Sequence, residues 1–289
     1  MKWISCIIKQ LSKLPLSVLY IFSDIIFYLI YYVMGYRKKE VFQNIKNSFP
    51  EKSEQEIQQI QRQFFKNFSD YIIETFKAIS ISENELKVRV QHINQHLFEE
   101  AQAEKKNIIL LTGHIFNWEW INALARIIPQ KNCHPVYKKI NNKFWEEQVL
   151  NIRNKFGNIS LEINELPRHI LKTPNNGETA YMFVADQSPH ISQVDVGITF
   201  LNQKTPVYIG YDKLSKLDLA FIYCDIKKVK RGYYQVNYYR MYPDNEKFKP
   251  FEVVLKFHKL LEKTIRKDPA NYLWSHKRWK NAHAIKQEI

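Results

Sequence analysis

The sequence predicts an α/β fold, in which a mixed sheet is flanked by helices and is preceded by a long apolar N-terminal helix. From residue 87 onward, apolar runs of strand length alternate with segments of helical periodicity. The run Ile108–Leu111 has the β-branched and aliphatic composition of a strand that is buried on both faces. Residues 14–36 carry a single charged side chain, Asp24.

The composition limits the kind of protein this can be. A chain of 289 residues can bury one large core, or form one domain plus an anchor. Apolar residues make up 45% and aromatic residues 14%, which excludes a disordered chain. The 43 basic residues outnumber the 29 acidic ones, so the net charge of +14 suits an anionic partner such as membrane phosphates, an acidic carrier protein or nucleic acid.

The three cysteines are few, odd in number and far apart. They form neither a zinc pattern nor a disulfide framework, which favours a reducing compartment and a role as small apolar residues. Their positions are Cys6, Cys133 and Cys224.

The apolar stretch 14–36 is long enough to span a bilayer core of about 30 Å. Asp24 at the bilayer centre would cost about 2.5–3.5 kcal/mol, which the apolar residues around it can outweigh, and a helix lying in the interface also fits. Basic residues flank both ends, so the positive-inside rule does not set an orientation. We therefore predict a membrane anchor over residues 1–36 and one domain over residues 37–289.

The first part of that domain is predicted to be helical. Val41, Ile45 and Phe49 recur with helical spacing before Pro50 ends the segment. Ser53-Glu-Gln-Glu56 is a capping box that opens a long helix extending to Phe76.

Strands and helices then alternate to the C-terminus, without an internal repeat or a linker, which predicts a single domain. The expected strands cover 87–92, 107–111, 132–137, 178–185, 205–211, 220–226 and 233–239, the last two as a hairpin. The expected helices cover 96–105, 118–128, 142–155 and 248–267.

His114 follows the buried strand after a Thr112-Gly113 turn, at the end of the strand where open α/β sheets bind ligands. A neutral imidazole can take a proton from a substrate hydroxyl, and a carboxylate on its other nitrogen would fix the tautomer. Glu119 lies five residues after His114, a spacing that does not place both side chains on one face of a continuous helix. A turn followed by a helix could still bring Glu119 back to His114. The spacing alone fits equally well a histidine bonded to the backbone and a solvated glutamate.

Other chemistries lack their motifs. The closest glycines are Gly197 and Gly210, so neither a dinucleotide-binding loop nor a P-loop is present. Gly-x-Ser-x-Gly is absent, and His92 and His96 have the zincin spacing without the glutamate base. Acid–base chemistry without a metal or a redox cofactor remains.

The string Gly113-His-Ile-Phe-Asn-Trp-Glu119 resembles the His-x4-Asp/Glu block of the lipid A secondary (lauroyl/myristoyl) acyltransferases, within the lysophospholipid acyltransferase-like superfamily. The resemblance extends over nearly the whole chain, in the family's order. Its other parts are Tyr36-Arg37, Asn44–Pro50, Val136-Tyr-Lys with Arg153 and Gly157, Ala185-Asp186-Gln187, and Leu273-Trp-Ser-His276-Lys-Arg278-Trp279-Lys280. One departure is Val136-Tyr-Lys-Lys139, which carries lysines where the second block is expected to hold an arginine.

The resemblance implies a glycerolipid acyltransferase-like fold and an acyl-carrier-protein thioester as co-substrate, with no other cofactor and no metal. The acceptor would be a hydroxyl of a lipid A precursor, at the cytoplasmic face of the bacterial inner membrane. His114 would act as general base with Glu119 orienting it, and Arg153 would bind substrate phosphate or neutralise developing charge. Asp186 would hold Arg153 or a loop in place. Further substrate-binding candidates are Asn117, Trp118, Gln187, His276 and Arg278.

Two alternatives stay open on the sequence. The same chemistry could act on another hydroxylated lipid, such as an aminolipid or a pigment. The second alternative is a non-enzymatic protein that binds anionic surfaces or nucleic acid. It is suggested by the aromatic and basic residues that interleave along 223–242. A half-exposed hairpin explains that pattern equally well, and the anchor favours a lipid or carrier partner over nucleic acid.

Overall fold

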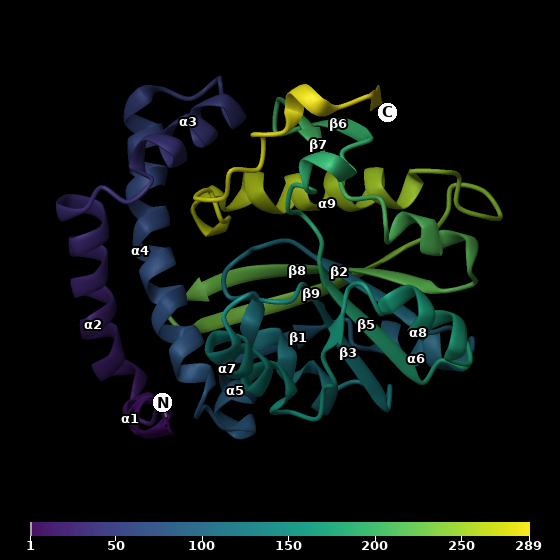
Figure 1. Cartoon of the computed structure of the whole chain (residues 1–289), viewed down its shortest axis with the longest axis horizontal. Coiled ribbons are helices and arrows are strands. Elements are labelled where there is room, and N and C mark those ends of the chain that lie inside the picture. The colour runs from purple at the N-terminus through teal and green to yellow at the C-terminus, as the bar shows by residue number, and fades with distance from the viewer. Residues whose placement is uncertain (1) are drawn as a thin grey trace.

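The computed structural model describes residues 2–289, with side chains from residue 7 onward, and is built around a mixed sheet (Figure 1). The order in the seven-stranded sheet is β1-β9-β8-β2-β5-β3-β4. Its strands are β1 (Val90–Ile93), β2 (Ile108–Thr112), β3 (Asn132–Tyr137), β4 (Leu161–Glu162), β5 (Thr179–Val184), β8 (Ala220–Lys230) and β9 (Tyr233–Met241). A three-stranded sheet has the order β10-β6-β7, with β6 (Val196–Phe200), β7 (Gln203–Pro206) and β10 (Gln287–Glu288).

Strand β2 lies inside the large sheet and pairs in parallel with β5 on one side and β8 on the other. Strand β9 returns antiparallel to β8, which makes the sheet mixed. In the β2–β5 register Thr112 lies opposite Val184, so the carboxyl ends of these two strands meet at the same edge. All five residues of β2 are buried, as its aliphatic composition predicts.

Helices flank the sheet, as expected from the sequence. Helix α9 packs against β8, and the small sheet lies beyond α9 (Figure 1). The α-helices are α1 (Lys2–Ser12), α2 (Leu16–Tyr28), α3 (Lys38–Ser48), α4 (Glu54–Ala78), α5 (Glu83–Arg89), α6 (His96–Ala103), α7 (Lys143–Asn154), α8 (Leu166–Lys172) and α9 (Glu252–Lys267). A π-helical segment, η1 (Leu29–Val33), continues α2, and the 3-10 helices are η2 (Trp118–Arg126), η3 (Ile191–Gln193), η4 (Asp212–Lys216), η5 (Pro269–Asn271) and η6 (Ala282–Ala284).

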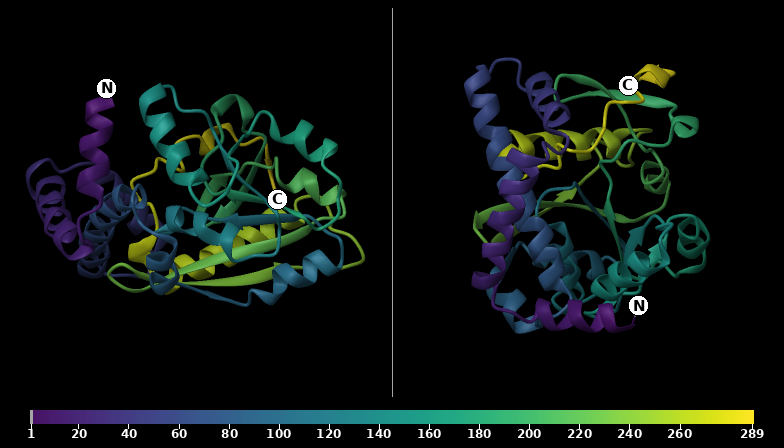
Figure 2. Two further views of the ribbon diagram at one scale, coloured as in Figure 1. Left: turned by 90° about the horizontal axis from the view of Figure 1, so that it is seen from below. Right: turned by 60° about the vertical axis from the view of Figure 1, so that its left-hand side comes forward.

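The predicted capping box of the long helix is confirmed. The Ser53 hydroxyl accepts a hydrogen bond from the Glu56 backbone N–H at 3.4 Å, and the Glu56 carboxylate accepts one from the Ser53 N–H at 2.9 Å. The helix buries Ile57, Phe64 and Phe65 and runs beside α2 along one side of the molecule (Figure 2).

Several predicted boundaries are wrong. The strand expected at 87–92 begins only at Val90, because Ser82 caps a short helix by accepting a hydrogen bond from the Glu85 N–H at 3.1 Å. The strand expected at 205–211 ends at Pro206, and the helix expected at 118–128 is the 3-10 helix η2.

The last long helix begins at Glu252 and not at residue 248, and tertiary contacts set that start. The Asp212 carboxylate accepts hydrogen bonds from the N–H groups of Phe251, Val253 and Val254, at 2.8, 3.1 and 3.2 Å. An aspartate so far away in sequence cannot be recognised as a cap from local patterns. Strands β4, β6 and β10 and helix α8 were not predicted.

The N-terminal segment packs onto the rest of the chain. Leu16, Leu19 and Phe27 are buried and belong to the main hydrophobic core. Leu16–Val33 is long and apolar enough to cross a membrane by length and composition. The division at residue 36 stays a prediction.

Two of the three cysteines have described side chains. Cys133 and Cys224 are buried free thiols, and burial raises the pKa of the Cys133 thiol to about 12. Cys6 lies outside the residues with described side chains.

Candidate active site

His114 and Asp186 form the centre of the candidate site, at the edge where β2 and β5 end together. The His114 Nδ1 lies 2.5 Å from the Asp186 Oδ1, which also accepts the His114 backbone N–H at 3.1 Å. A Cβ at position 113 would lie 2.5 Å from Leu261 Cδ1, so glycine before the histidine lets α9 pack closely on this loop.

The charge state of the pair follows from the surroundings of Asp186. Burial by itself would raise the pKa of this carboxyl, but the charge and hydrogen bond of His114 and the charge of Arg278 hold the pKa well below its usual range. The Tyr272 hydroxyl also hydrogen-bonds the carboxylate. Because an ionised carboxylate only accepts hydrogen bonds, the shared proton lies on His114 Nδ1. The Nε2 of a neutral His114 is then an unprotonated acceptor.

Gln187 contacts that nitrogen. Its Nε2 donates to His114 Nε2 at 2.9 Å, and the Gln187 side chain is exposed. Replacing this amide by a substrate hydroxyl would give the contact that a general base needs. His114 and Gln187, two of the predicted site residues, therefore lie in contact.

The predicted pairing of His114 with Glu119 is wrong, because the two carboxylates have exchanged their expected partners. Glu119 accepts hydrogen bonds from Arg153 Nη2 at 2.6 Å and Arg153 Nε at 3.2 Å. Asp186, which was expected to hold Arg153, instead holds His114. The parallel register places Asp186 beside His114, whereas the turn into η2 directs Glu119 toward α7.

Glu119 and Arg153 form a tight and nearly enclosed ion pair. Their side chains are 8% and 19% exposed, and Glu119 also accepts from Trp118 Nε1 at 3.1 Å and from Asn122 Nδ2 at 3.2 Å. Burial alone would raise the pKa of Glu119, but the Arg153 charge and hydrogen bonds lower it, and the pKa of Arg153 is raised in turn. Glu119 therefore fixes a guanidinium near the site, and its catalytic role stays a prediction.

Trp118 lies between the two charged pairs. Its ring meets the His114 ring edge to face at a centroid distance of 4.8 Å, while its Nε1 donates to Glu119. On its other side it packs on Tyr71 of α4, at a centroid distance of 4.3 Å. This ring shapes the surroundings of His114, and substrate binding by Trp118 stays a prediction.

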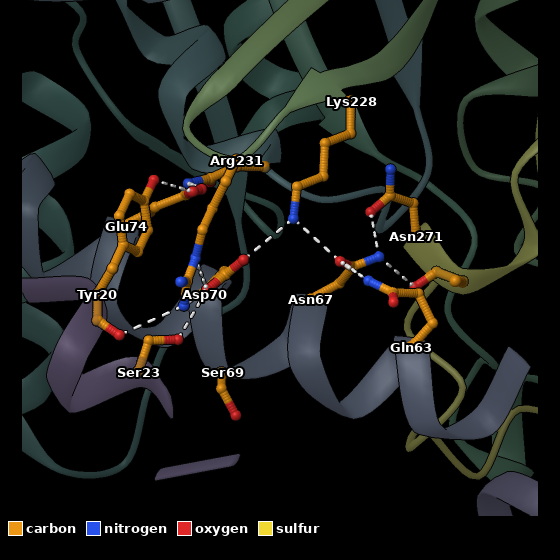
Figure 3. Close-up of polar contacts among 12 residues, drawn as sticks. Tyr20, Ser23, Gln63, Asn67, Ser69, Asp70, Glu74, Lys228, Arg231 and Asn271 are labelled. Atoms are coloured by element: carbon orange, nitrogen blue, oxygen red, sulfur yellow. Dashed lines mark hydrogen bonds and ion pairs between the residues drawn. The ribbon is translucent and has the colours of Figure 1, made fainter. Parts of the chain in front are cut away.

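Asn117 caps η2 and links it to α4. Its Oδ1 accepts the Glu119 N–H at 3.1 Å and its Nδ2 donates to Glu74 at 3.1 Å. Glu74 is buried and accepts a hydrogen bond from the Tyr20 hydroxyl at 2.8 Å (Figure 3). It also accepts one from the Tyr234 hydroxyl, at 2.6 Å. The contacts give Asn117 a structural role, and substrate binding by it stays a prediction.

Arg278 was expected to bind substrate, but its side chain is buried and not accessible. Only 1% of it is exposed, its Nη2 donates to His258 Nε2 at 3.0 Å, and its guanidinium lies 5.0 Å from the Phe200 ring centroid. It acts on the site through its charge, which stabilises the Asp186 carboxylate. His276 belongs to the same cluster, and burial lowers its pKa to about 4, so its imidazole is neutral at pH 7.

Sequence reasoning missed Tyr272, Glu74 and His258. Tyr272 forms an isolated antiparallel bridge with Ile115, which joins the C-terminal segment to the His114 loop. No local signal marks these residues. Within the described part of the chain no three metal-ligating side chains gather, and the absence of a cofactor stays a prediction.

Arg153→Lys is expected to raise the KM for a phosphorylated substrate by about 10-fold, because a lysine cannot form the two-pronged contact with Glu119 that fixes the guanidinium. Steady-state kinetics with varied acceptor concentration measures this. The exposed Arg168→Lys on α8 is the matched control and should leave KM unchanged. An unchanged KM in Arg153→Lys would contradict a substrate-binding role.

Comparison with known proteins identifies the family of the chain. A search of curated proteins gives no match. A family model described as bacterial lipid A biosynthesis acyltransferase matches residues 1–281. The chain, in which a histidine base candidate lies at the edge of an α/β sheet, therefore belongs to the bacterial lipid A biosynthesis acyltransferase family.

Proposed function

We propose that this acyltransferase moves a fatty acyl chain from an acyl-carrier-protein thioester to a hydroxyl of a lipid A precursor, with His114 as general base. The observation that carries the proposal is the His114–Asp186 pair, which directs an unprotonated Nε2 toward the exposed Gln187. We further propose that the enzyme works at the cytoplasmic face of the bacterial inner membrane.

The reaction follows from the proton positions. His114 Nε2 removes the proton of the acceptor hydroxyl while the oxygen attacks the thioester carbonyl carbon, and Asp186 stabilises the imidazolium that forms. The tetrahedral intermediate then collapses, the carbon–sulfur bond breaks, and the thiolate takes the proton from Nε2. The product is an ester and a free thiol, and His114 returns to its starting state.

Gln187 is suited to a second task. When a substrate hydroxyl replaces it at His114 Nε2, its amide is free to donate to the oxygen that becomes negatively charged. Arg153, anchored by Glu119, supplies positive charge for a phosphate on the donor or the acceptor.

The charge distribution supports an acidic carrier as donor. A groove of about 710 Å³ lies between α9 and β6, and four basic side chains line it. They are Lys259, Lys263, Arg266 and Lys267. The same groove is lined by His258, whose Nε2 contacts Arg278 beside the active site. An acidic carrier protein would be attracted to this face.

A reconstituted assay tests the proposed function. The full chain in mixed micelles is given acyl carrier protein loaded with a labelled fatty acid, together with a lipid A precursor, an aminolipid or a hydroxylated pigment. Mass spectrometry is expected to find one added acyl chain on the lipid A precursor. Acylation of only another lipid would replace the acceptor, and acylation from coenzyme A alone would replace the donor.

A further inference from the structure

The outer face of the α2–η1 segment, Leu16–Val33, is an apolar stripe. Its exposed side chains recur every three or four residues, so they lie on one side of the helix. Ile21 is 60% exposed, Tyr28 59% and Val33 64%. The stripe consists of Val18, Ile21, Phe22, Ile25, Tyr28, Leu29, Tyr32 and Val33.

The inner face of the same helix carries polar contacts, in contrast to an ordinary surface helix. The Ser23 hydroxyl donates to Asp70 on α4 at 2.7 Å, and the Tyr20 hydroxyl donates to Glu74 at 2.8 Å. Figure 3 shows these residues on facing sides of the two helices. The inner face thus combines buried apolar residues with these polar contacts, while the large apolar side chains of the stripe face outward.

Asp24 is also held by the protein. Arg231, in the β8–β9 turn, contacts Asp24 at 2.6 Å and Asp70 at 2.7 Å, and Lys228 contacts Asp70 at 3.1 Å. The charge of the apolar stretch therefore belongs to a network that includes α4 and the β-hairpin. Figure 3 shows Lys228 and Arg231 of the hairpin at Asp70 of α4.

These contacts are incompatible with α2 crossing a bilayer. Because α2 lies along α4, a spanning α2 would carry Asp24 and Arg231, whose side chains are 69% and 38% exposed, into the hydrocarbon. Charged groups are strongly disfavoured there. Detaching α2 instead would break its contacts with Asp70 and Glu74.

Basic residues lie at both ends of the stripe, Lys9 and Lys13 before it and Arg37, Lys38 and Lys39 after it. We propose that α2 and η1 do not span the membrane but lie in the plane of its interface, with the stripe inserted into one leaflet and the basic ends on anionic headgroups. A stripe of aliphatic residues with tyrosines suits this position.

This orientation connects the membrane face to His114. A series of aromatic rings runs from the end of the stripe to the histidine. Successive ring centroids are 6.4 Å apart for Tyr36–Phe68, 6.4 Å for Phe68–Tyr71, 4.3 Å for Tyr71–Trp118 and 4.8 Å for Trp118–His114. These packed rings join the segment that follows the stripe to His114.

Depth measurements test the proposal. Single cysteines at Val18, Ile25 and Tyr32 carry a fluorophore in the full chain with Cys6→Ser, since Cys133 and Cys224 are buried. The protein binds phosphatidylethanolamine–phosphatidylglycerol vesicles whose acyl chains are brominated at shallow or deep positions. We expect equal, shallow depths at the three sites. A spanning helix would instead separate the outer two by about 21 Å.

The outcomes are distinguishable from those of the activity assay, because no step requires turnover. A depth gradient along the helix overturns the proposal, and so does the absence of quenching at all three sites. A probe at Leu171, which is 77% exposed on α8, should not be quenched.

A vesicle-binding measurement with a double substitution tests the proposal without a fluorophore. Ile21→Asp with Ile25→Asp is expected to weaken vesicle binding by about 10-fold or more, because each charge must leave the interface. The control pair is Val88→Asp with Leu171→Asp, two exposed apolar residues outside the stripe, and should bind as the unchanged protein does. Equal binding by both pairs would contradict the proposal.

Discussion

Turnover of the enzyme is expected to fall by about 10²–10⁴-fold when His114 is replaced by alanine, which is the usual contribution of a general base. The substitution removes the imidazole whose Nδ1 is held by Asp186 and whose unprotonated Nε2 is directed toward Gln187. The KM values should change little, because the Glu119–Arg153 pair remains in place. Single-turnover measurement of acyl transfer gives the rate of the chemical step.

Two controls separate chemistry from folding. His96→Ala removes an imidazole that is 60% exposed and should leave turnover unchanged. Free imidazole added to His114→Ala should restore part of the rate, which would not happen if the substitution had only damaged the fold. Turnover of His114→Ala within about threefold of the unchanged enzyme would contradict the role of general base.

The fold could be predicted where local patterns decide it. The aliphatic run of β2 and the Ser53–Glu56 capping box are both present as the sequence indicates. Boundaries fixed by distant residues could not be predicted, as the start of α9 shows, because Asp212 supplies the hydrogen bonds there. The orientation of α2 also depends on Asp70 and Arg231, which no local pattern connects to it.

The structure brings several of the predicted site residues together, but not in the predicted pairings. His114, Glu119, Arg153 and Asp186 all lie in one region, yet the sequence spacing paired the histidine with the wrong carboxylate. Both His114 and Asp186 follow apolar strands, and recognising β2 and β5 as parallel neighbours would have brought them together. The order of the strands in the sheet cannot be read from the sequence around His114 or from the sequence around Asp186.

Asp186→Asn is expected to lower turnover by about 10²–10⁴-fold, because an asparagine amide can hold the imidazole in the other tautomer, with its proton on Nε2. A protonated Nε2 cannot accept the proton of a hydroxyl. The same substitution leaves the buried Arg278 without the carboxylate that balances it. It should therefore also lower the free energy of unfolding, by about 3–5 kcal/mol.

The pH dependence of unfolding tests whether the ionised Asp186 carboxylate stabilises the fold. Since the folded-state pKa of Asp186 lies below that of an unfolded aspartate, about 3.9, its ionised form stabilises the fold above about pH 4. That contribution is lost as the pH falls through the folded-state pKa. Asp186→Asn should thus make unfolding less steeply dependent on pH below about pH 4. Denaturant unfolding at several pH values measures it.

A double variant separates the tautomer from the buried charge. Asp186→Asn with Arg278→Met removes both charges, so part of the lost stability should return, because the buried guanidinium that lacked a balancing carboxylate is gone as well. Turnover should stay low, since the imidazole tautomer is still wrong. If turnover returned together with stability, Asp186 would serve only the fold, and His114 would have to be oriented by another group. Retained stability with lost turnover would instead assign to Asp186 the orienting task that the sequence motif gave to Glu119.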